Sequence, residues 1–382
     1  MVSSHTYNLT GGIDIFFTDS GAPPDSTDYT TLVILHGSAF TGHGFEKMHD
    51  YSHADNLRTV IWNRRDYPGS TPYTDAELED LNQGGKVFLD RLAIQVADFL
   101  KQFIEKEKVP KITADRKAGG FAILGWSMGS ATAMPLFSDP SLLSSELYAL
   151  LEQYVKNLVL YDPPYLSFGY QLPADEKTYN PWTDPDCKTP EELYQNFGFW
   201  VSSYYDHPDV SGTINGLDYR KRTDKATITS WTPEEFQRNY CESAAVRSEL
   251  RMYVPPMQPT LNDLTNRVLF DEVLTQTFFP KVPVTYISAT RSNWHCVWGY
   301  IEAKRNYEKQ LTEGKKIRPT RFYVVEGGNH FVHGDQPQDL VELTAKGISW
   351  RFPSSFAKLI PEAGEAHVNR YDEHGPRSAT KE

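Results

Sequence analysis

The chain has 382 residues and a formal net charge of −12, with 38 Lys and Arg against 50 Asp and Glu. This acidic balance argues against nucleic acid or an anionic membrane as a partner and favours solubility. The length suffices for one large α/β domain with an insertion, or for two domains.

The cysteines and the N-terminus point to a reducing compartment. Cys187, Cys241 and Cys296 are scattered without a CxxC pair, so they predict neither a zinc site nor a disulfide framework. The first residues lack a basic segment followed by an apolar run, and no stretch is apolar enough to span a bilayer. We therefore expect a cytoplasmic protein with no membrane span, no metal and no cofactor. A homodimer is left open.

Apolar runs that alternate with helical patterns predict a parallel sheet. Two short strands are expected at 7–9 and 13–18, and buried strands at 31–35, 59–62, 121–126 and 157–161. Helices are expected at 87–107 and 144–154, where apolar residues recur at helical spacing. This alternation predicts a three-layer α/β architecture around a mostly parallel sheet.

The pattern changes between residues 163 and 280, where no buried strand is evident. Thr189–Glu192 and Thr232–Glu235 each place a capping threonine before a proline at the first helical position, with a glutamate at the capping-box position. We interpret this aromatic-rich segment as a helical lid over the site. A separate helical domain unrelated to catalysis is the alternative.

The sheet pattern resumes after residue 280. Strands are expected at 282–288 and 321–325, and helices at 297–310 and 339–350. The core domain would then comprise 1–162 and 281–360, and the polar stretch 361–382 would be a flexible tail.

A strand-turn-helix pattern surrounds Ser127. The apolar run 121–126 leads into Gly125-x-Ser127-x-Gly129 and then into a helix-compatible segment, which is the order of a nucleophile elbow. Such a turn projects the serine hydroxyl above the sheet edge, and the helix that follows points its free N–H groups at the reaction site. The sequence therefore predicts Ser127 as a nucleophile. A Gly/Ser turn without a catalytic role is the alternative.

A serine hydroxyl needs a base to act as a nucleophile at neutral pH. Of the eleven histidines, His330 follows a late strand and a Gly-Gly turn, which places it on the same edge of a parallel sheet as Ser127. His333 is the rival, but three residues further on it would support the loop or line the pocket. His295 and His36 are more typical of structural histidines. We predict His330 as the base.

The imidazole in turn needs a carboxylate to fix its tautomer, and the expected chain order is nucleophile, acid, histidine. The loop 289–294 contains no carboxylate, whereas Asp162 directly follows the strand 157–161. Asp162 is therefore the predicted acid. It could instead only cap the turn before Pro163, and Glu326 is the other candidate acid, although its closeness to His330 would require an unusual turn.

The oxyanion of a tetrahedral intermediate needs backbone N–H donors. One is expected from Met128, the residue after the nucleophile, and the second from Ser38 in the loop after the strand 31–35, with Ala39 the next candidate. The His36-Gly37 pair could also be only a tight strand exit. The residues expected to contact the substrate are Ala39, Trp126, Tyr165 and Phe331.

Four segments, Leu35–Gly37, Arg65–Ser70, Gly125–Gly129 and Asn329–His333, together resemble the α/β-hydrolase superfamily in kind and order. The resemblance extends from residue 31 to about 352, apart from the expected lid. It implies a mostly parallel eight-stranded sheet with Ser127 as nucleophile and His330 as base. Many members carry the acid after the penultimate strand, where this chain has none. A subset that includes some fungal lactone hydrolases carries it one strand earlier, at the position of Asp162.

The resemblance narrows the reaction without fixing it, because this fold hosts many activities. The resemblance implies that dehalogenases and epoxide hydrolases of this fold carry an aspartate where this chain has Ser127. We therefore expect acyl transfer to water. The aromatic lid suggests an apolar substrate. We predict an esterase or lactonase acting on a hydrophobic small molecule, such as a polyketide-like secondary metabolite. A carbon–carbon, amide or peptide bond hydrolase and a non-catalytic ligand-binding protein of the same fold are the alternatives.

Overall fold

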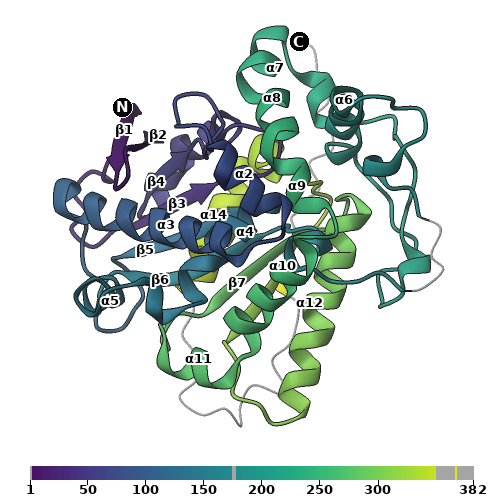
Figure 1. Cartoon of the computed structure of the whole chain (residues 1–382). Coiled ribbons are helices and arrows are strands. Elements are labelled where there is room, and N and C mark those ends of the chain that lie inside the picture. The colour runs from purple at the N-terminus through teal and green to yellow at the C-terminus, as the bar shows by residue number, and fades with distance from the viewer. Residues whose placement is uncertain (1, 174–177, 350–365, 368–382) are drawn as a thin grey trace, which may run out of the picture.

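The computed structural model describes residues 2–173, 178–349 and 366–367, and a twisted sheet forms its centre (Figure 1). The strands are β1 (Ser3–Leu9), β2 (Ile13–Asp19), β3 (Thr30–Leu35), β4 (Leu57–Trp62), β5 (Phe121–Trp126), β6 (Val155–Tyr161), β7 (Val284–Ala289), β8 (Thr320–Val325) and β9 (Ala366–His367). Their order in the sheet is β1-β2-β4-β3-β5-β6-β7-β8-β9. Only the β1/β2 and β2/β4 pairs are antiparallel in the described sheet. The predicted mostly parallel sheet is thus confirmed, and the two-residue β9 extends its edge.

The five strands from β3 to β7 are buried along their whole length. Their side chains, most of them apolar, are buried on both faces, as parallel strands under two helical layers require. Because the strands are parallel, their carboxyl ends meet at one edge of the sheet. The loops that carry Ser38, Ser127, Asp162 and His330 leave the sheet at that edge.

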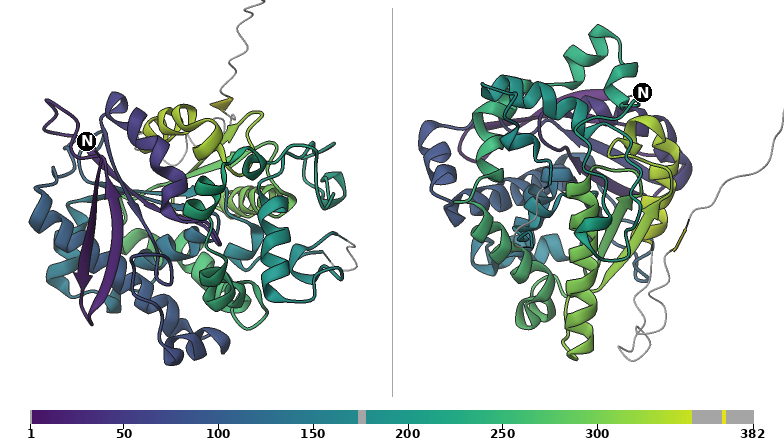
Figure 2. Two further views of the ribbon diagram at one scale, coloured as in Figure 1. Left: turned by 90° about the horizontal axis from the view of Figure 1, so that it is seen from above. Right: turned by 90° about the vertical axis from the view of Figure 1, so that its right-hand side faces the viewer.

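Helices cover both faces of the sheet (Figures 1 and 2). One layer contains α3 (Lys86–Glu107), α4 (Ser130–Ala133) and α5 (Ser145–Glu152), and the other α1 (His49–Ser52) and α14 (Pro337–Ile348). The remaining helices of the core are α2 (Asp75–Asn82), α12 (Trp294–Thr312) and α13 (Val332–Asp335). The apolar stripe predicted for 87–107 lies on the side of α3 that faces the sheet. Ten residues of this helix are buried.

The segment between β6 and β7 is helical and irregular, and its described part contains no named strand. Its helices are α6 (Pro190–Val201), α7 (Pro233–Asn239), α8 (Glu242–Ala244), α9 (Leu250–Tyr253), α10 (Gln258–Thr265) and α11 (Glu272–Thr277). Both predicted capping boxes are present, because Thr189 and Thr232 accept from the backbone N–H of Glu192 and Glu235. π-Helical turns at Ala245–Glu249 and Asn266–Phe270 interrupt the later helices.

Some boundaries differ from the sequence-based prediction. The helix α12 starts at Trp294, three residues before the expected start, because Asn293 caps it through the backbone N–H of Cys296. The helix α2 was not predicted, although Thr74 and Glu77 form a capping box there. The predicted tail 361–382 lies outside the described residues apart from Ala366–His367, which pair with β8. None of the described helices combines the length and apolar content that crossing a membrane requires.

Candidate active site

Ser127 occupies a sharp turn between β5 and α4. Its backbone lies in the left-handed region, with φ at 54°. A Cβ at Gly125 would lie 2.6 Å from the carbonyl oxygen of Gly129, and a Cβ at Gly129 would lie 2.2 Å from that of Leu35. Any side chain at these two positions would force β3, β5 and α4 apart. The turn therefore requires the glycines on both sides of the serine.

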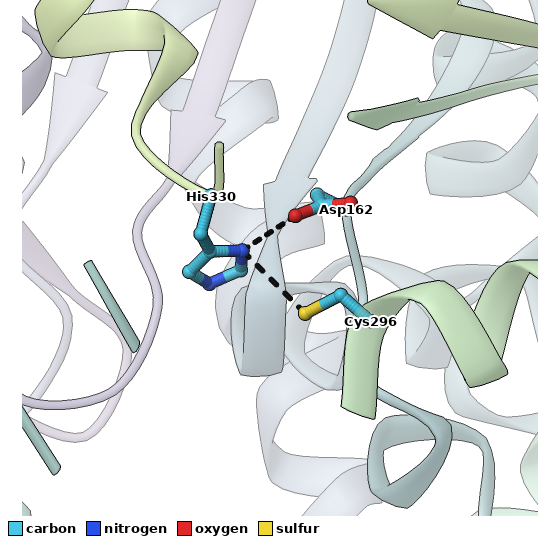
Figure 3. A group of neighbouring side chains, drawn as sticks. All are labelled: Asp162, Cys296 and His330. Atoms are coloured by element: carbon cyan, nitrogen blue, oxygen red, sulfur yellow. Dashed lines mark hydrogen bonds and ion pairs between the residues drawn. The ribbon is translucent and has the colours of Figure 1, made fainter. Parts of the chain in front are cut away.

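His330 and Asp162 meet across the edge of the sheet (Figure 3). The Nδ1 atom of His330 lies 2.6 Å from Oδ2 of Asp162, and both side chains are buried. Since a carboxylate only accepts hydrogen bonds, this contact places the imidazole proton on Nδ1 and leaves Nε2 as the basic nitrogen. The carbonyl of His330 accepts from Trp126 Nε1 at 3.0 Å and Tyr161 Oη at 3.2 Å, which fixes the loop.

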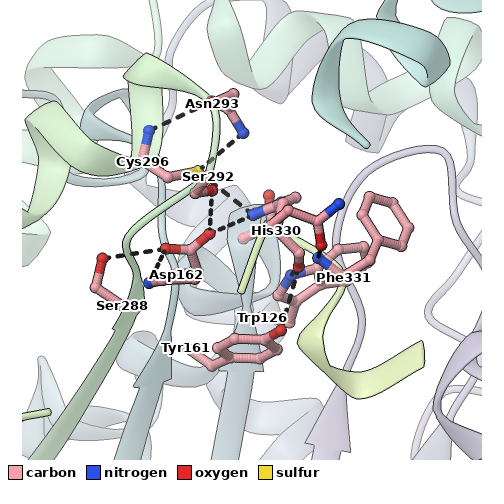
Figure 4. A network of polar contacts seen from close by, with 12 residues as sticks. Trp126, Tyr161, Asp162, Ser288, Ser292, Asn293, Cys296, His330 and Phe331 are labelled. Atoms are coloured by element: carbon pink, nitrogen blue, oxygen red, sulfur yellow. Dashed lines mark hydrogen bonds and ion pairs between the residues drawn. The ribbon is translucent and has the colours of Figure 1, made fainter. Parts of the chain in front are cut away.

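The Asp162 carboxylate accepts further hydrogen bonds (Figure 4). Ser292 Oγ donates to Oδ2 at 2.5 Å, while Ser288 Oγ and the Ala289 N–H donate to Oδ1 at 3.2 and 3.3 Å. Donors of this kind stabilise the ionised carboxylate, which has no solvent contact of its own. These contacts fix the orientation of the carboxylate towards the imidazole of His330.

Ser127 and His330 line one small cavity of about 10 Å³. The other residues on its wall are Pro164, Trp182, Phe197, Trp200, Val201, Tyr253, Asn293, His295 and Cys296. Among the described hydrogen bonds none joins Ser127 Oγ to His330 Nε2, and apo active sites often form this contact only when substrate is bound. Six members of the wall come from the segment between β6 and β7, and four of these are aromatic.

The loop after β3 runs directly against Ser127. A Cβ at Gly37 would lie 2.7 Å from Cβ of Ser127, so only glycine allows this approach. The next residue, Ser38, has a backbone N–H with no partner among the described hydrogen bonds. The N–H of Ala39, by contrast, donates to Tyr67 Oη at 2.8 Å. Of the two backbone N–H groups considered as oxyanion donors in this loop, that of Ser38 is therefore the one still available.

A buried ion pair lies beneath this loop. Arg64 Nη2, from the chain after β4, is 2.6 Å from Glu249 Oε1 of the segment between β6 and β7. Glu249 also accepts from Ser38 Oγ at 2.6 Å, and Ser38 Oγ accepts from Tyr253 Oη at 2.7 Å. Burial, and next to it the Arg64 charge, lowers the pKa of His36 well below its ordinary value, so that imidazole is neutral. Two residues of the inserted segment thus hold the side chain of Ser38.

The cavity wall contains none of the four residues expected to contact substrate. Trp126 packs behind it, with its ring centroid 4.8 Å from that of His330, and Tyr165 lies 5.1 Å from His295. Phe331 packs against Phe40 at 4.8 Å, and the N–H of Ala39 is already bonded to Tyr67 as described above. These four residues therefore pack around the cavity without lining it.

The two rival residues lie apart from the His330–Asp162 pair. His333 is buried and stacks on Phe45 at 3.9 Å, with burial as the main cause of a pKa well below its ordinary value. Glu326 is exposed. Neither is on the described wall of the cavity.

Cys296 is a member of the site that the sequence reasoning missed. Its Sγ lies 3.5 Å from His330 Nδ1, so Asp162, Cys296 and His330 offer three potential metal-ligand atoms within 4.8 Å of one another (Figure 3). Burial raises the pKa of Cys296 well above its ordinary value, so without a metal ion the thiol stays protonated beside His330 and Asp162. Ser292 and Asn293, both in the loop 289–294, are the sequence features from which this polar cluster could have been predicted.

The comparisons with known proteins agree with this geometry. A family model described as "Alpha/beta hydrolase family" matches residues 32–343, and the chain therefore belongs to that family. Hydrolysis is the class of reaction that this membership supports. A comparison with curated proteins gave no match.

Solved structures share the fold at low identity. An epoxide hydrolase from an endophytic Streptomyces aligns with a TM-score of 0.54 and 13% identity over 91% of this chain and 95% of its own. A laboratory-evolved variant of potato epoxide hydrolase gives 0.52 and 15%, over 91% and 98%. The thioesterase domain from the curacin biosynthetic pathway gives 0.48 and 16%, over 91% and 99%. At these identities the likeness concerns the fold alone.

Proposed function

We propose that this chain is a serine hydrolase that cleaves an ester or lactone of a hydrophobic small molecule through an acyl-enzyme. The observation that carries the proposal is the His330–Asp162 contact of 2.6 Å on the cavity that Ser127 also lines. A nucleophile, a base and an acid from three separate loops share one edge of the sheet. This convergence is what acyl transfer needs and a structural turn does not.

The proposed reaction begins with attack of Ser127 Oγ on the ester carbonyl, while His330 Nε2 takes the hydroxyl proton. The N–H groups of Met128 and Ser38 stabilise the oxyanion, each contributing about 3–4 kcal/mol to lowering the barrier. His330 then gives its proton to the leaving alcohol, and a water molecule, activated by the same imidazole, hydrolyses the acyl-enzyme. Asp162 stays ionised throughout and stabilises the imidazolium.

The segment between β6 and β7 is proposed as the lid. It supplies six of the eleven residues on the described cavity wall, and its four aromatic side chains there would exclude water from the acyl-enzyme. The cavity volume of about 10 Å³ is far below the 300–1,000 Å³ usual for ligand pockets, so a substrate must displace lid side chains to bind. The similarity in fold to epoxide hydrolases does not change the proposal. Epoxide hydrolases of this fold have an aspartate at the position where this chain has Ser127.

The test is labelling by a fluorophosphonate, followed by intact-mass analysis. The native protein should gain one adduct, and Ser127→Ala should gain none. Ser138→Ala is the matched control, because this buried serine donates to the Pro135 carbonyl in the core and should not affect labelling. A panel of esters and lactones then defines the bond cleaved.

The competing proposal is a ligand-binding protein of the same fold without turnover. Absence of an adduct on folded native protein, together with no turnover on the panel, would establish that alternative and remove the acyl-enzyme mechanism.

A further inference from the structure

Three nitrogen atoms on the cavity residues lack a partner. His295 Nε2, Trp182 Nε1 and Trp200 Nε1 are each buried, and none forms a hydrogen bond within the described part of the chain. A buried polar atom without a partner is destabilising, so its presence in a folded protein calls for an explanation. All three residues line the cavity that contains Ser127, where a ligand can supply the missing partner.

The three rings all lie on the cavity wall and pack against other aromatic side chains. His295 meets Trp200 edge-on, with centroids 4.7 Å apart, and Trp182 stacks on Tyr253 at 4.6 Å. His295 is also the chain neighbour of Cys296, whose thiol contacts the base His330. The unpartnered nitrogens therefore belong to residues next to the reacting groups.

The charge of the cavity wall restricts which ligand can bind there. The residues that line the described cavity include no Lys, Arg, Asp or Glu. Burial lowers the pKa of His295 to about 3, so its imidazole is neutral at physiological pH. A charged substrate group would find no counter-ion here, and its desolvation would oppose binding.

The donor and acceptor inventory narrows the ligand further. An indole N–H only donates, whereas a neutral imidazole nitrogen can accept when its partner nitrogen carries the proton. A phenolic hydroxyl both donates and accepts, so it can satisfy the imidazole and an indole N–H at once. A phenol also stays neutral at pH 7, and its planar ring packs well against aromatic side chains.

We propose that His295, Trp182 and Trp200 form a subsite for a hydroxyl group on an aromatic ring of the substrate. The substrate class is then a hydroxyaryl ester or lactone. This inference rests on the proposed function and names the substrate class of that same site.

The experiment measures binding without turnover. In the Ser127→Ala background, dissociation constants are measured by calorimetry for matched pairs that differ by one ring hydroxyl. The probes are methyl benzoate with its 3- and 4-hydroxy forms, phenyl acetate with its 3- and 4-hydroxy forms, and dihydrocoumarin with 7-hydroxydihydrocoumarin. At least one hydroxylated probe should bind about tenfold to a hundredfold more tightly than its parent.

Added variants locate that preference. His295→Phe and Trp200→Phe should each bring the ratio towards one while leaving the affinity for the unsubstituted probe within about threefold. Trp62→Phe is the matched control, because the Trp62 indole nitrogen is also buried and unpartnered but lies on β4 away from the cavity wall. It should keep the full ratio. If His295→Phe does not fold, His295→Gln and Trp200→Phe decide.

The inference is overturned if no pair shows a hydroxyl preference, or if the preference survives both cavity variants. Failure of the proposed function looks different. In that case the fluorophosphonate adduct and turnover are absent, while the hydroxyl preference in binding and its loss in the cavity variants remain.

Discussion

The Asp162 carboxylate at the sheet edge and two indoles of the segment between β6 and β7 differ in how their polar atoms are paired. At the sheet edge the Asp162 carboxylate accepts from His330 and from three further donors, so its position is fixed before any substrate arrives. In the inserted segment the indole nitrogens of Trp182 and Trp200 have no partner among the residues that the structure describes. The difference fits a division between groups that carry out the chemistry and groups that select the ligand. Changes at the edge should then affect every substrate, and changes in the segment only some.

The largest effect should come from Asp162→Asn. The amide favours the wrong tautomer of His330, so kcat should fall about 10³–10⁴-fold for every ester tested while the fold persists. Steady-state kinetics over the ester panel, with circular dichroism as the folding control, measure this. A loss restricted to some substrates would break the proposed division between edge and segment. Near-normal activity would remove Asp162 from its role.

A second large effect should appear where the two regions meet. Glu249→Gln leaves the buried Arg64 without its counter-charge and should reduce the free energy of unfolding by about 3–5 kcal/mol. Urea denaturation measures it. The matched control is Glu46→Gln, because Glu46 also pairs across the boundary at 2.6 Å, with the largely exposed Arg238. That change should cost about 0–1 kcal/mol. Equal effects of the two substitutions would refute the importance of the buried pair.

A third test concerns pH and uses two buried histidines, His295 on the cavity wall and His49 on α1 away from it. Burial lowers the pKa of His49 to about 4 and that of His295 to about 3. Because these folded-state values lie below the ordinary 6.5, the unfolded chain binds more protons in acid. The stability is fully present above pH 6.5 and is lost as pH falls towards the folded-state values.

Each of the two histidines should account for about 2 kcal/mol of the stability lost between pH 7.5 and pH 5. His49→Gln and His295→Gln should therefore flatten the pH dependence of the urea midpoint to a similar extent. Only His295→Gln should also change substrate preference. If His49→Gln changed that preference as well, the assignment of selection to the cavity wall would be wrong.

The smallest effect is expected for Cys296→Ala. The protonated thiol makes only a weak contact with His330 Nδ1, so kcat should change within about threefold. Steady-state kinetics on one good substrate measure this. A larger loss would mean that Cys296 positions the imidazole together with Asp162, and would extend the fixed network of the sheet edge into α12.

Much of the sheet edge could be predicted from local sequence. The apolar runs of β3, β5 and β6 are continuous, and the residues at their carboxyl ends must share an edge because the strands are parallel. Ser127, Asp162 and His330 therefore came together as expected from strand order alone. Their catalytic roles stay proposals.

The cavity wall could not be predicted in this way. Trp182, Trp200 and Tyr253 come from short helices and turns whose arrangement depends on tertiary contacts. No periodic pattern in the sequence indicates which aromatic side chains face Ser127. The expected substrate contacts Trp126 and Phe331 were chosen because they adjoin Ser127 and His330 in sequence. In the structure, neighbouring residues along the chain point to different sides, and these two pack behind the site.

Backbone conformation at the sheet edge has a consequence for how this protein can be stabilised. After each of β3, β4, β5 and β6 a residue other than glycine adopts positive φ: Ala39 at 67°, Asp66 at 70°, Ser127 at 54° and Asp162 at 46°. Each such residue costs on the order of 1–3 kcal/mol. Selection for thermal stability alone would favour glycine at these positions. A library screened only for heat resistance should therefore accumulate inactive proteins with Gly at position 127, whereas one screened for turnover should gain its stability elsewhere.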